Sequence, residues 1–341
     1  MKKVLQKYLA GALAALMCFG ASLFVACGND NAASSLTSQE SSSTTSQESS
    51  SSAGQESSSS AGQDSPSAGK DSSSAEQDSS STETGTEQVI RLKVGSYNIA
   101  HGLCYDANGS NAEVNLGKTA RALKDLGLEI VGLNEVYDKG SDDRYSNQTF
   151  KLALFFGTTK YVFGEAYQFN WGGGVAIGNS VLSKYEIVDS QNYFVPAPTE
   201  AERRPNETAW YEDRIIVKTT IDVGREICFI TTHFGLNGLE QERMAAKLVE
   251  VLDAETRPII LCGDFNASPD SKVLQPIYAR LQSAADVTDK RYKPTIASWN
   301  PYATIDYIFV SEAFTVKDFD VANVVLSDHL PLWADLELAN V

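Results

Sequence analysis

The chain has 341 residues, of which 42% are hydrophobic, and a formal net charge of −16. This length allows one large domain or two ordinary ones, and the hydrophobic content is sufficient for a sizeable core. The excess of acidic residues excludes a histone-like or architectural nucleic-acid binder, because that mode of binding depends on clustered Lys and Arg that displace counterions.

The N-terminal residues are typical of an export signal. Three lysines among the first seven residues precede an apolar run from Leu9 to Ala26, a pattern found in secretory signals and short membrane spans. The segment Leu23-Phe24-Val25-Ala26-Cys27 resembles the lipobox of a bacterial lipoprotein signal. The resemblance implies a signal peptide over residues 1–26, a lipid on Cys27, and an exported lipoprotein anchored to the bacterial membrane, at the cell surface or in the periplasm. An ordinary signal peptide and an uncleaved anchor are the alternatives.

Residues 27–86 are rich in Ser and poor in large apolar side chains. Between residues 34 and 86 there is no aromatic residue, and Leu36 is the one aliphatic residue larger than Ala. Such a segment cannot bury enough apolar surface to offset the entropy lost on ordering. We predict a disordered tether over 27–86, with a root-mean-square span of roughly 40 Å, or a glycosylated stalk, and a folded domain over 87–341.

Apolar runs of strand length recur through the predicted domain. In chain order they cover residues 90–94, 130–133, 174–177, 215–217, 227–230, 258–261, 307–310 and 332–338. Apolar residues spaced by three or four predict helices over 115–126 and 240–252. Strands outnumber helices, and a short turn over 222–225 joins two of them, which indicates an α+β fold of packed sheets with helices outside.

Polar side chains stand at the ends of these apolar runs. In chain order they are Asn98, Glu135, His233, Asp264, Asn266, Asp306, Asp328 and His329. Any one of them alone is explained by turn chemistry or a solvated cap. Asp264 and Asn266 lie two residues apart, so an extended backbone directs both side chains to the same face. Two of the three His in the chain belong to the set, which favours a common catalytic site.

Two segments are specific motifs: Gly-Asp-Phe-Asn at 263–266 and Ser-Asp-His-Leu-Pro at 327–331. Together with Asn98 and Glu135, they resemble the endonuclease/exonuclease/phosphatase superfamily, the DNase I-like metal-dependent phosphohydrolases. The match extends over nearly all of 90–341. It implies a four-layer α/β sandwich, with two central sheets flanked by helices and the active site at one end. Asn134 departs from the superfamily pattern, where Gln is more usual, and we expect this to change local hydrogen bonding but not metal binding.

The resemblance also implies a site for Mg²⁺ or Mn²⁺. Glu135 is expected to be the principal ligand, with Asn98 beside it and Asp328 near the metal. Carboxylate oxygens suit these hard cations better than zinc. The chain has no Cys-x-x-Cys or His-x-x-x-His spacing that would favour a zinc site.

Carried over residue by residue, the resemblance implies a division of catalytic roles. Asp264 is expected to orient or deprotonate the attacking water, and Asn266 to fix the phosphate and the nucleophile. His233 and His329 are expected to contact phosphoryl oxygens as a pair of imidazoliums. Asp306 is expected to pair with His329 and hold its tautomer.

Two further residues are assigned supporting roles. Asp213 is expected to pair with His233 as Asp306 does with His329. His101 lies three residues beyond Asn98 and either touches the substrate or occupies a loop. Of the remaining cysteines, Cys104, Cys228 and Cys262, we expect neither a disulfide nor thiol chemistry, because the last two belong to apolar runs.

The predicted activity is that of a metal-dependent phosphoester hydrolase, first a phosphodiesterase. A secreted nuclease ranks second, because the net negative charge of the domain disfavours binding of a nucleic acid. A sphingomyelinase-like lipid phosphodiesterase ranks third, with residues 193–196 as an exposed apolar hairpin or a buried loop. A non-enzymatic surface binding module comes last, because binding alone does not require the full polar set. The expected partners are a phosphoester substrate (nucleic acid, lipid or small molecule) and the membrane through the lipid anchor only, with no obligate protein partner.

Overall fold

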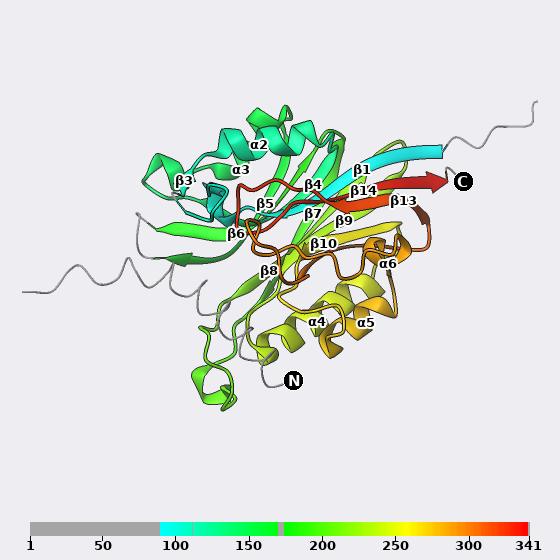
Figure 1. The fold of residues 1–341 in the computed structure, drawn as a ribbon. Coiled ribbons are helices and arrows are strands. Elements are labelled where there is room, and N and C mark those ends of the chain that lie inside the picture. Colours follow the sequence, from blue (N-terminus) through cyan, green and yellow to red (C-terminus); the bar gives the residue numbers. More distant parts are fainter. Residues whose placement is uncertain (1–88, 111, 170–173, 340–341) are drawn as a thin grey trace, which may run out of the picture. The chain divides into compact units, whose positions relative to one another are not determined.

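The computed structural model describes residues 89–339 except 111 and 170–173. The signal peptide expected over 1–26, the lipidation site at Cys27 and the tether expected over 27–86 lie outside the described residues and stay predictions. Two six-stranded sheets dominate the described part (Figure 1). Among its helices, none has both the length and the apolar character that a membrane crossing requires.

The first sheet has the strand order β13-β14-β1-β4-β6-β5. Its strands are β1 (Val89–Asn98), β4 (Ile130–Asp138), β5 (Lys160–Phe169), β6 (Val175–Ser183), β13 (Phe314–Val321) and β14 (Leu332–Ala339). Strands β1 and β4 are parallel, whereas the other neighbouring pairs are antiparallel. A parallel pair requires a crossover connection, and helix α2 (Leu116–Asp125) lies within it.

The second sheet repeats this plan with the order β11-β12-β10-β9-β8-β7. Its strands are β7 (Glu186–Val195), β8 (Arg214–Asp222), β9 (Glu226–His233), β10 (Ile259–Asp264), β11 (Gln282–Ser283) and β12 (Asp306–Val310). Strands β9 and β10 form the parallel pair, and helix α4 (Gly238–Asp253) lies in their crossover. Each sheet therefore has one central pair of strands whose carboxyl ends point the same way.

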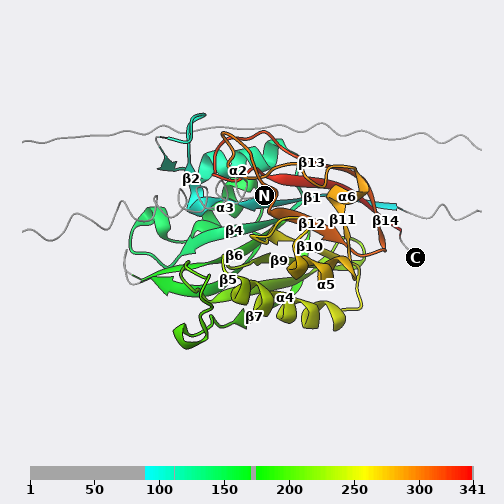
Figure 2. The same cartoon turned by 60° about the horizontal axis from the view of Figure 1, so that its bottom comes forward.

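Helices cover the outer faces of the two sheets. Helices α2 and α3 (Gln148–Phe156) lie on the first sheet, and α4 and α5 (Gln275–Tyr278) on the second, as Figure 2 shows from another side. Asn115 caps the N-terminus of helix α2, and its side chain accepts a hydrogen bond from the Lys118 backbone. Helix α4 begins with a capping box between Asn237 and Glu240. Short elements complete the fold: β2 (Leu103–Cys104), β3 (Glu113–Val114) and α6 (Ala284–Val287).

Three apolar clusters separate the four layers. The largest lies between the sheets and includes Val94 and Ile130 from the first and Phe229 and Ile260 from the second. The other two lie between each sheet and its helices. The expected four-layer α/β sandwich is therefore confirmed.

All eight predicted strand runs lie in or beside strands, and both predicted helices are present. No predicted run or helix corresponds to β5, β7, β13 or α3, or to the short elements β2, β3, β11, α5 and α6. Strand β7 lies at a sheet edge and most of its side chains are exposed, so no apolar run marks it. Residues 193–195 end this strand, with Phe194 exposed and Val195 buried, and so form neither the apolar hairpin nor the buried loop considered above.

Gly263 is required by a close approach between β9 and β10. Its φ is +146°, and a Cβ at this position would lie 1.9 Å from the Thr232 carbonyl oxygen. We expect Gly263→Ala to lower the free energy of unfolding by more than about 3 kcal/mol, because neighbouring backbone must move. Urea denaturation measures the change.

Gly157→Ala is the matched control for this prediction. Gly157 also has a positive φ, +93°, but a Cβ there meets nothing within 4 Å, so we expect a loss of about 1 kcal/mol. Equal losses in the two variants would contradict the steric explanation.

Candidate active site

The carboxyl ends of β1, β4, β9 and β10 meet at one end of the sandwich. Val89 at the start of β1 pairs with Ala339 at the end of β14, so Asn98 lies at the end of the sheet away from the C-terminus in Figure 1. Asn98 pairs with Asn134 on β4, and His233 pairs with Asp264 across β9 and β10. The topology thus brings the predicted polar set together.

Glu135 is placed by a bulge in β4. The register of β4 against β6 shifts between Leu133 and Val136, and Glu135 has a φ of +54°. Its Oε1 accepts a hydrogen bond of 3.0 Å from Asn98 Nδ2. Burial, and then the charge of Asp328, raise the pKa of Glu135 to about 7, although the bond from Asn98 acts in the opposite direction.

Asp264 lies at the centre of the cluster. Its Oδ2 is 3.0 Å from Asn98 Nδ2, 3.5 Å from His233 Nε2 and 3.6 Å from His329 Nε2. Burial, and then the charge of Asp306, raise the pKa of Asp264 to about 7. A carboxyl group with a pKa near neutrality is well suited to accept a proton.

Two hydrogen bonds fix Asp264, one through its backbone and one through its side chain. The Asp264 amide N donates to Asn134 Oδ1 over 3.0 Å, and Asp264 Oδ1 accepts from the Asn266 amide N over 2.9 Å. Asn134 is fully buried and also donates to Asn179 Oδ1 and to the Thr232 carbonyl. Asn134 therefore ties β4 to strands β9 and β10 of the second sheet.

His329 forms the expected pair with Asp306. Its Nδ1 is 2.8 Å from Asp306 Oδ2, and the same oxygen accepts a 2.6 Å hydrogen bond from Thr295 Oγ1. Burial acts to lower the pKa of His329, but the charges of Asp306 and Asp264 outweigh it and raise that pKa well above the usual value. His329 is therefore an imidazolium at neutral pH.

His233 has a different environment from the one expected. Its Nδ1 lies 3.5 Å from Arg214 Nη1, and Arg214 in turn binds Glu212 Oε2 over 2.7 Å. On the other side, Asn266 Nδ2 is 3.2 Å from His233 Nε2. Burial, and then the charges of Arg214 and His329, hold the pKa of His233 well below its usual value.

Two expectations about His233 are therefore wrong. Asp213 does not pair with it, because the Asp213 carboxylate accepts a hydrogen bond from the Ala197 backbone over 2.7 Å. The two histidines are not a pair of imidazoliums either, since His233 is neutral beside the Arg214 cation. The site contains one charged histidine, His329, and one neutral histidine.

The donor set near Glu135 fits a divalent cation. Glu135 and Asp328 are carboxylates whose mutual repulsion contributes to the raised pKa of Glu135, and a cation between them would relieve it. Asn98 is oriented differently: its Nδ2 faces Glu135 and Asp264, and its Oδ1 accepts from the Ala100 backbone. Asn98 thus donates to both carboxylates, and its expected role beside the metal stays a prediction.

A second group of possible ligands consists of Asp264, Asp306 and His329, whose ligand atoms lie within 4.8 Å of one another. The hydrogen bonds between Asp306 Oδ2, His329 Nδ1 and Thr295 account for this cluster without a metal. Glu135 and Asp328 are therefore the better candidates.

His101 packs into the wall of the site. Its ring stacks on Tyr137 with centroids 4.5 Å apart, and its Nδ1 is buried with no hydrogen-bond partner among the described residues. Burial lowers the pKa of His101 to about 4, although Asp328 acts against this change. His101 lies in the short 3-10 turn Ala100–Gly102 and is partly buried, so both expectations, substrate contact and a place in a loop, stay predictions.

Arg214, Thr295 and the hydrogen bond from the Asp264 backbone to Asn134 were not predicted from the sequence. Arg214 begins β8 and directly follows Asp213, the residue expected to pair with His233. Thr295 lies in a loop outside any strand run, and nothing in the sequence marks it. Asn134 was noticed as an unusual residue, but its bond to the Asp264 backbone requires the two sheets to be in place.

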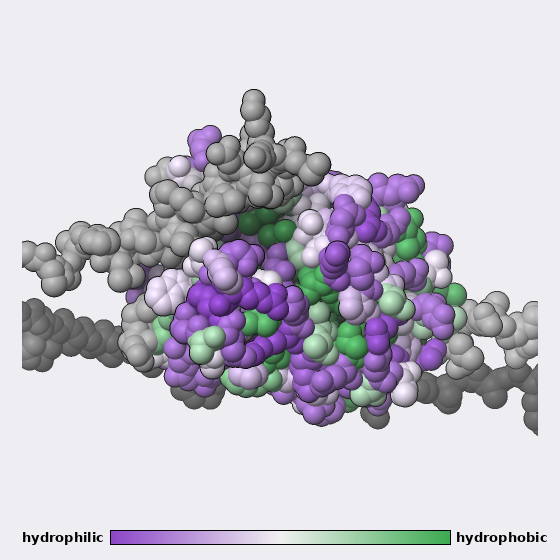
Figure 3. Space-filling view, turned by 90° about the horizontal axis from the view of Figure 1, so that it is seen from below, coloured by the Kyte–Doolittle hydropathy of each residue, from purple (hydrophilic) through white to green (hydrophobic). Residues whose placement is uncertain are grey.

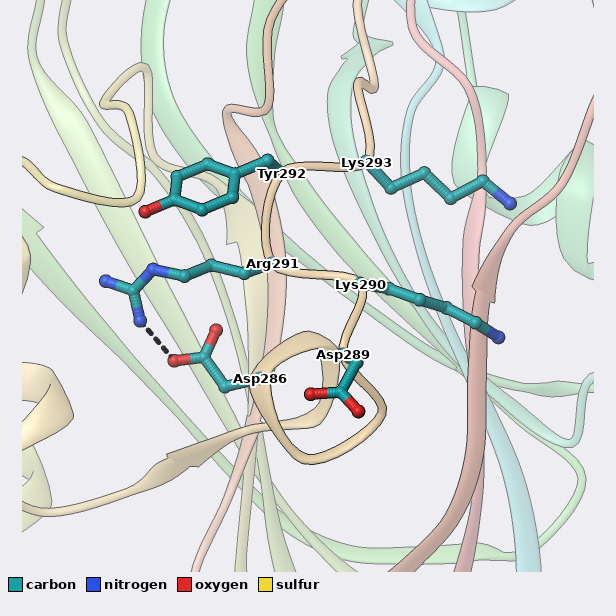
Figure 4. Close-up of a pocket in the computed structure, with 6 residues that line it drawn as sticks. All are labelled: Asp286, Asp289, Lys290, Arg291, Tyr292 and Lys293. Atoms are coloured by element: carbon teal, nitrogen blue, oxygen red, sulfur yellow. Dashed lines mark hydrogen bonds and ion pairs between the residues drawn. The ribbon is translucent and has the colours of Figure 1, made fainter.

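A hollow of about 610 Å³ lies away from this cluster, beside α6. It is lined by Asp286, Asp289, Lys290, Arg291, Tyr292 and Lys293 (Figure 4). Arg291 pairs with Asp286, while Lys290 and Lys293 pair with aspartates on β13. The hollow shares no residue with the polar cluster, and its cations are already paired, so we place the chemistry at the strand ends.

Comparisons with known proteins agree with this geometry. Residues 95–329 match the model of the Endonuclease/Exonuclease/phosphatase family. Nocturnin from Xenopus laevis is 30% identical over 113 residues, which are 27% of this chain and 28% of that protein. The chain thus matches well under a third of the length of this curated relative.

Solved structures share the fold. An endonuclease/exonuclease/phosphatase from Beutenbergia cavernae DSM 12333 superimposes with a TM-score of 0.60 at 24% identity, over 73% of this chain and 72% of that one. A mannosyl-6-phosphatase from Bacteroides thetaiotaomicron VPI-5482 gives 0.53 at 20% identity, over 72% and 99%. At these identities the likeness shows the sandwich architecture.

Because the pKa of Glu135 is raised, replacing this residue by the uncharged Gln should stabilise the folded protein at higher pH. The stabilising effect of Glu135 relative to the unfolded chain is present below its unfolded pKa and is lost as pH rises through about 7. Without added metal, Glu135→Gln should therefore become more stable than wild type as pH rises from 5 to 8, by on the order of 2 kcal/mol. Urea denaturation at several pH values measures this.

The exposed Glu312 provides the control. Glu312→Gln should follow the wild-type pH dependence, and added Mg²⁺ should stabilise Glu312→Gln but not Glu135→Gln. A constant offset of Glu135→Gln from wild type across this pH range would contradict the assigned pKa shift.

Proposed function

Because this chain belongs to the Endonuclease/Exonuclease/phosphatase family, we propose that it is a metal-dependent phosphodiesterase. Members of the family are phosphoester hydrolases that depend on divalent metals. The observation that carries the proposal is the position of Asp264 Oδ2, within 3.6 Å of both His233 Nε2 and His329 Nε2 and bonded to Asn98 Nδ2. A proton acceptor and several donors thus converge on one point.

Asp264 is the proposed proton acceptor for the attacking water. Its pKa of about 7 lets it be ionised in much of the population at neutral pH while remaining basic enough to take a proton. Asn98 and Asn266 fix its two oxygens, so the carboxylate keeps one orientation during the reaction. Orientation of this kind reduces the entropy lost on reaching the transition state.

His329 is the proposed source of positive charge at the phosphoryl group. Asp306 keeps it protonated, and Thr295 keeps Asp306 in place. As the P–O bond breaks, negative charge grows on the phosphoryl and leaving oxygens, and a fixed imidazolium lowers the energy of that state. Asn266 and the neutral His233 provide further polar contacts on the opposite side.

Glu135 and Asp328 would hold the cation, which supplies polarisation of a phosphoryl oxygen and acidification of water when bound. The charge balance of the protein groups favours a diester over a monoester. A phosphodiester carries a single negative charge, and His329 is the one histidine that is charged. A dianionic monoester would face the carboxylates of Glu135, Asp264 and Asp328 with less compensation.

We extend the proposal to an exported protein held at the membrane. The lysines at the start of the chain, the apolar run from Leu9 and the lipobox-like segment ending at Cys27 support it. Replacing Cys27 by Ser should release the protein from the membrane fraction of the cells that make it. Retention of the variant in that fraction would favour an uncleaved anchor.

The function is tested with bis(p-nitrophenyl) phosphate and p-nitrophenyl phosphate, with Mg²⁺, with Mn²⁺ and with a chelator. We expect metal-dependent release of nitrophenol, faster from the diester. Asp264→Ala and His329→Ala should each lower turnover at least about a hundredfold while the fold persists. Near-wild-type rates in either variant would remove the assignment, and a faster monoester reaction would make the protein a phosphatase.

Arg214 provides a second kinetic prediction. Arg214→Gln removes the cation beside His233 Nδ1, so the pKa of His233 should rise and turnover at neutral pH should fall about tenfold. Comparison with Arg225→Gln, on the β8–β9 turn far from the site, separates this effect from general loss of charge. If both variants kept wild-type rates, Arg214 would have no part in the reaction.

A further inference from the structure

The outer face of helix α3 carries exposed apolar side chains. Phe150, Leu154 and Phe155 are 50%, 60% and 51% exposed. Phe150 and Leu154 are one helical turn apart, so they lie on the same side of the helix. The Tyr161 ring at the start of β5 lies 6.3 Å from the Phe150 ring and extends the group. Contiguous apolar residues on a surface are typical of contact sites.

The neighbouring helix α2 presents a basic stripe. Lys118, Arg121 and Lys124 are exposed and recur at every third residue, and Asp125 is the one acidic residue of this helix. Lys118 pairs with Glu113 over 3.0 Å. Within the part of the chain that the structure describes, neither Arg121 nor Lys124 forms an ion pair. A basic stripe is unusual in a chain whose net charge is −16.

Helices α2 and α3 lie side by side over the first sheet, as Figures 1 and 2 both show. We propose that they dock onto a lipid bilayer with anionic head groups. The α2–α3 face consists of Phe150, Leu154 and Phe155 with Lys118, Arg121 and Lys124. Aromatic and aliphatic side chains beside a row of cations are the combination by which surface helices bind anionic membranes.

The chain outside the described structure also points to a membrane. It includes the apolar run that ends at Ala26 and the expected lipidation site Cys27, followed by a predicted tether with a span of roughly 40 Å. The described part of the domain begins at Val89 in β1, and β1 belongs to the sheet that α2 and α3 cover. A tether of this length does not select a face by itself, so a preferred orientation requires a surface with affinity for lipid.

The two competing occupants are less well matched to the face. A symmetric dimer through this surface would bring the two basic stripes together, and like charges would repel. A polynucleotide would pair with the cations but would leave the α3 side chains without an apolar partner.

The side of the domain opposite α2 and α3 has a different surface. Figure 3 shows this side, and hydrophilic residues predominate over its visible surface.

Docking would also place the active site close to the membrane. Helix α3 begins at Gln148, whose Nε2 donates to the His101 carbonyl over 2.7 Å and whose Oε1 accepts from the Tyr137 backbone over 2.8 Å. The docked helix is thus connected to the wall of the site. The docking itself does not depend on the proposed reaction.

The test uses the chain from residue 27 onward with Cys27→Ser, so that no acyl chain is attached and the whole described region is kept. Flotation with vesicles measures binding at about 0.1 M salt. We expect binding to vesicles of mixed phosphatidylglycerol and phosphatidylcholine to exceed binding to phosphatidylcholine alone by about tenfold. Replacing Phe150, Leu154 and Phe155 by Ser, or Lys118, Arg121 and Lys124 by Glu, should each lower binding by about tenfold or more.

Matched controls lie elsewhere on the surface. Phe194→Ser with Tyr292→Ser removes aromatic side chains that are 52% and 64% exposed, and Lys272→Glu with Lys317→Glu reverses exposed charges. These variants should bind like wild type, and thermal unfolding midpoints verify that every variant is folded.

Three results would overturn the proposal. One is failure of the unmodified face to bind anionic vesicles, and another is wild-type binding by both triple variants. The third is a dimer in sedimentation that dissociates in the α3 triple variant without vesicle binding, which would assign the face to a second copy of the chain.

Discussion

The Asn98 amide links the two sheets at the point where the chemistry takes place. Its nitrogen donates to Glu135 from the first sheet and to Asp264 from the second, both over 3.0 Å. Two neighbouring carboxylates of raised pKa would repel each other without such a donor between them. Asn134 provides a second link, since it belongs to β4 and holds the Asp264 backbone. The geometry of the site therefore depends on the registration of one sheet against the other.

The two histidines show how the environment divides roles between identical side chains. Both are at the ends of strands or in adjoining loops, and both approach the same Asp264 oxygen. The charge of Asp306 raises the pKa of His329, whereas burial, and then the charge of Arg214, lower the pKa of His233. The resulting site has one fixed positive charge from histidine, flanked by carboxylates that suit a hard cation. This balance is what directs the proposal towards phosphodiesters.

Much of the framework could be predicted from the sequence because buried strands leave apolar runs and the catalytic side chains stand beside their ends. Glu135 and Asp264 follow such runs, whereas Asp306 and His329 precede them. Edge strands such as β7 were missed because their side chains face water. The choice of Asp213 failed for a different reason: neighbouring residues in an extended chain point to opposite sides, so an error of one position exchanges a carboxylate for the guanidinium of Arg214. Thr295 required knowledge of how a distant loop returns to Asp306.

The pairing of Val89 with Ala339 brings the two ends of the domain together, at the end of the sandwich opposite the active site. Chain ends in such a position can be joined by a short linker and new ends opened in a surface loop. The fold is therefore suited to circular permutation, with the catalytic strand ends left undisturbed. The same arrangement lets a reporter domain be fused at either end of the domain, away from the catalytic strand ends.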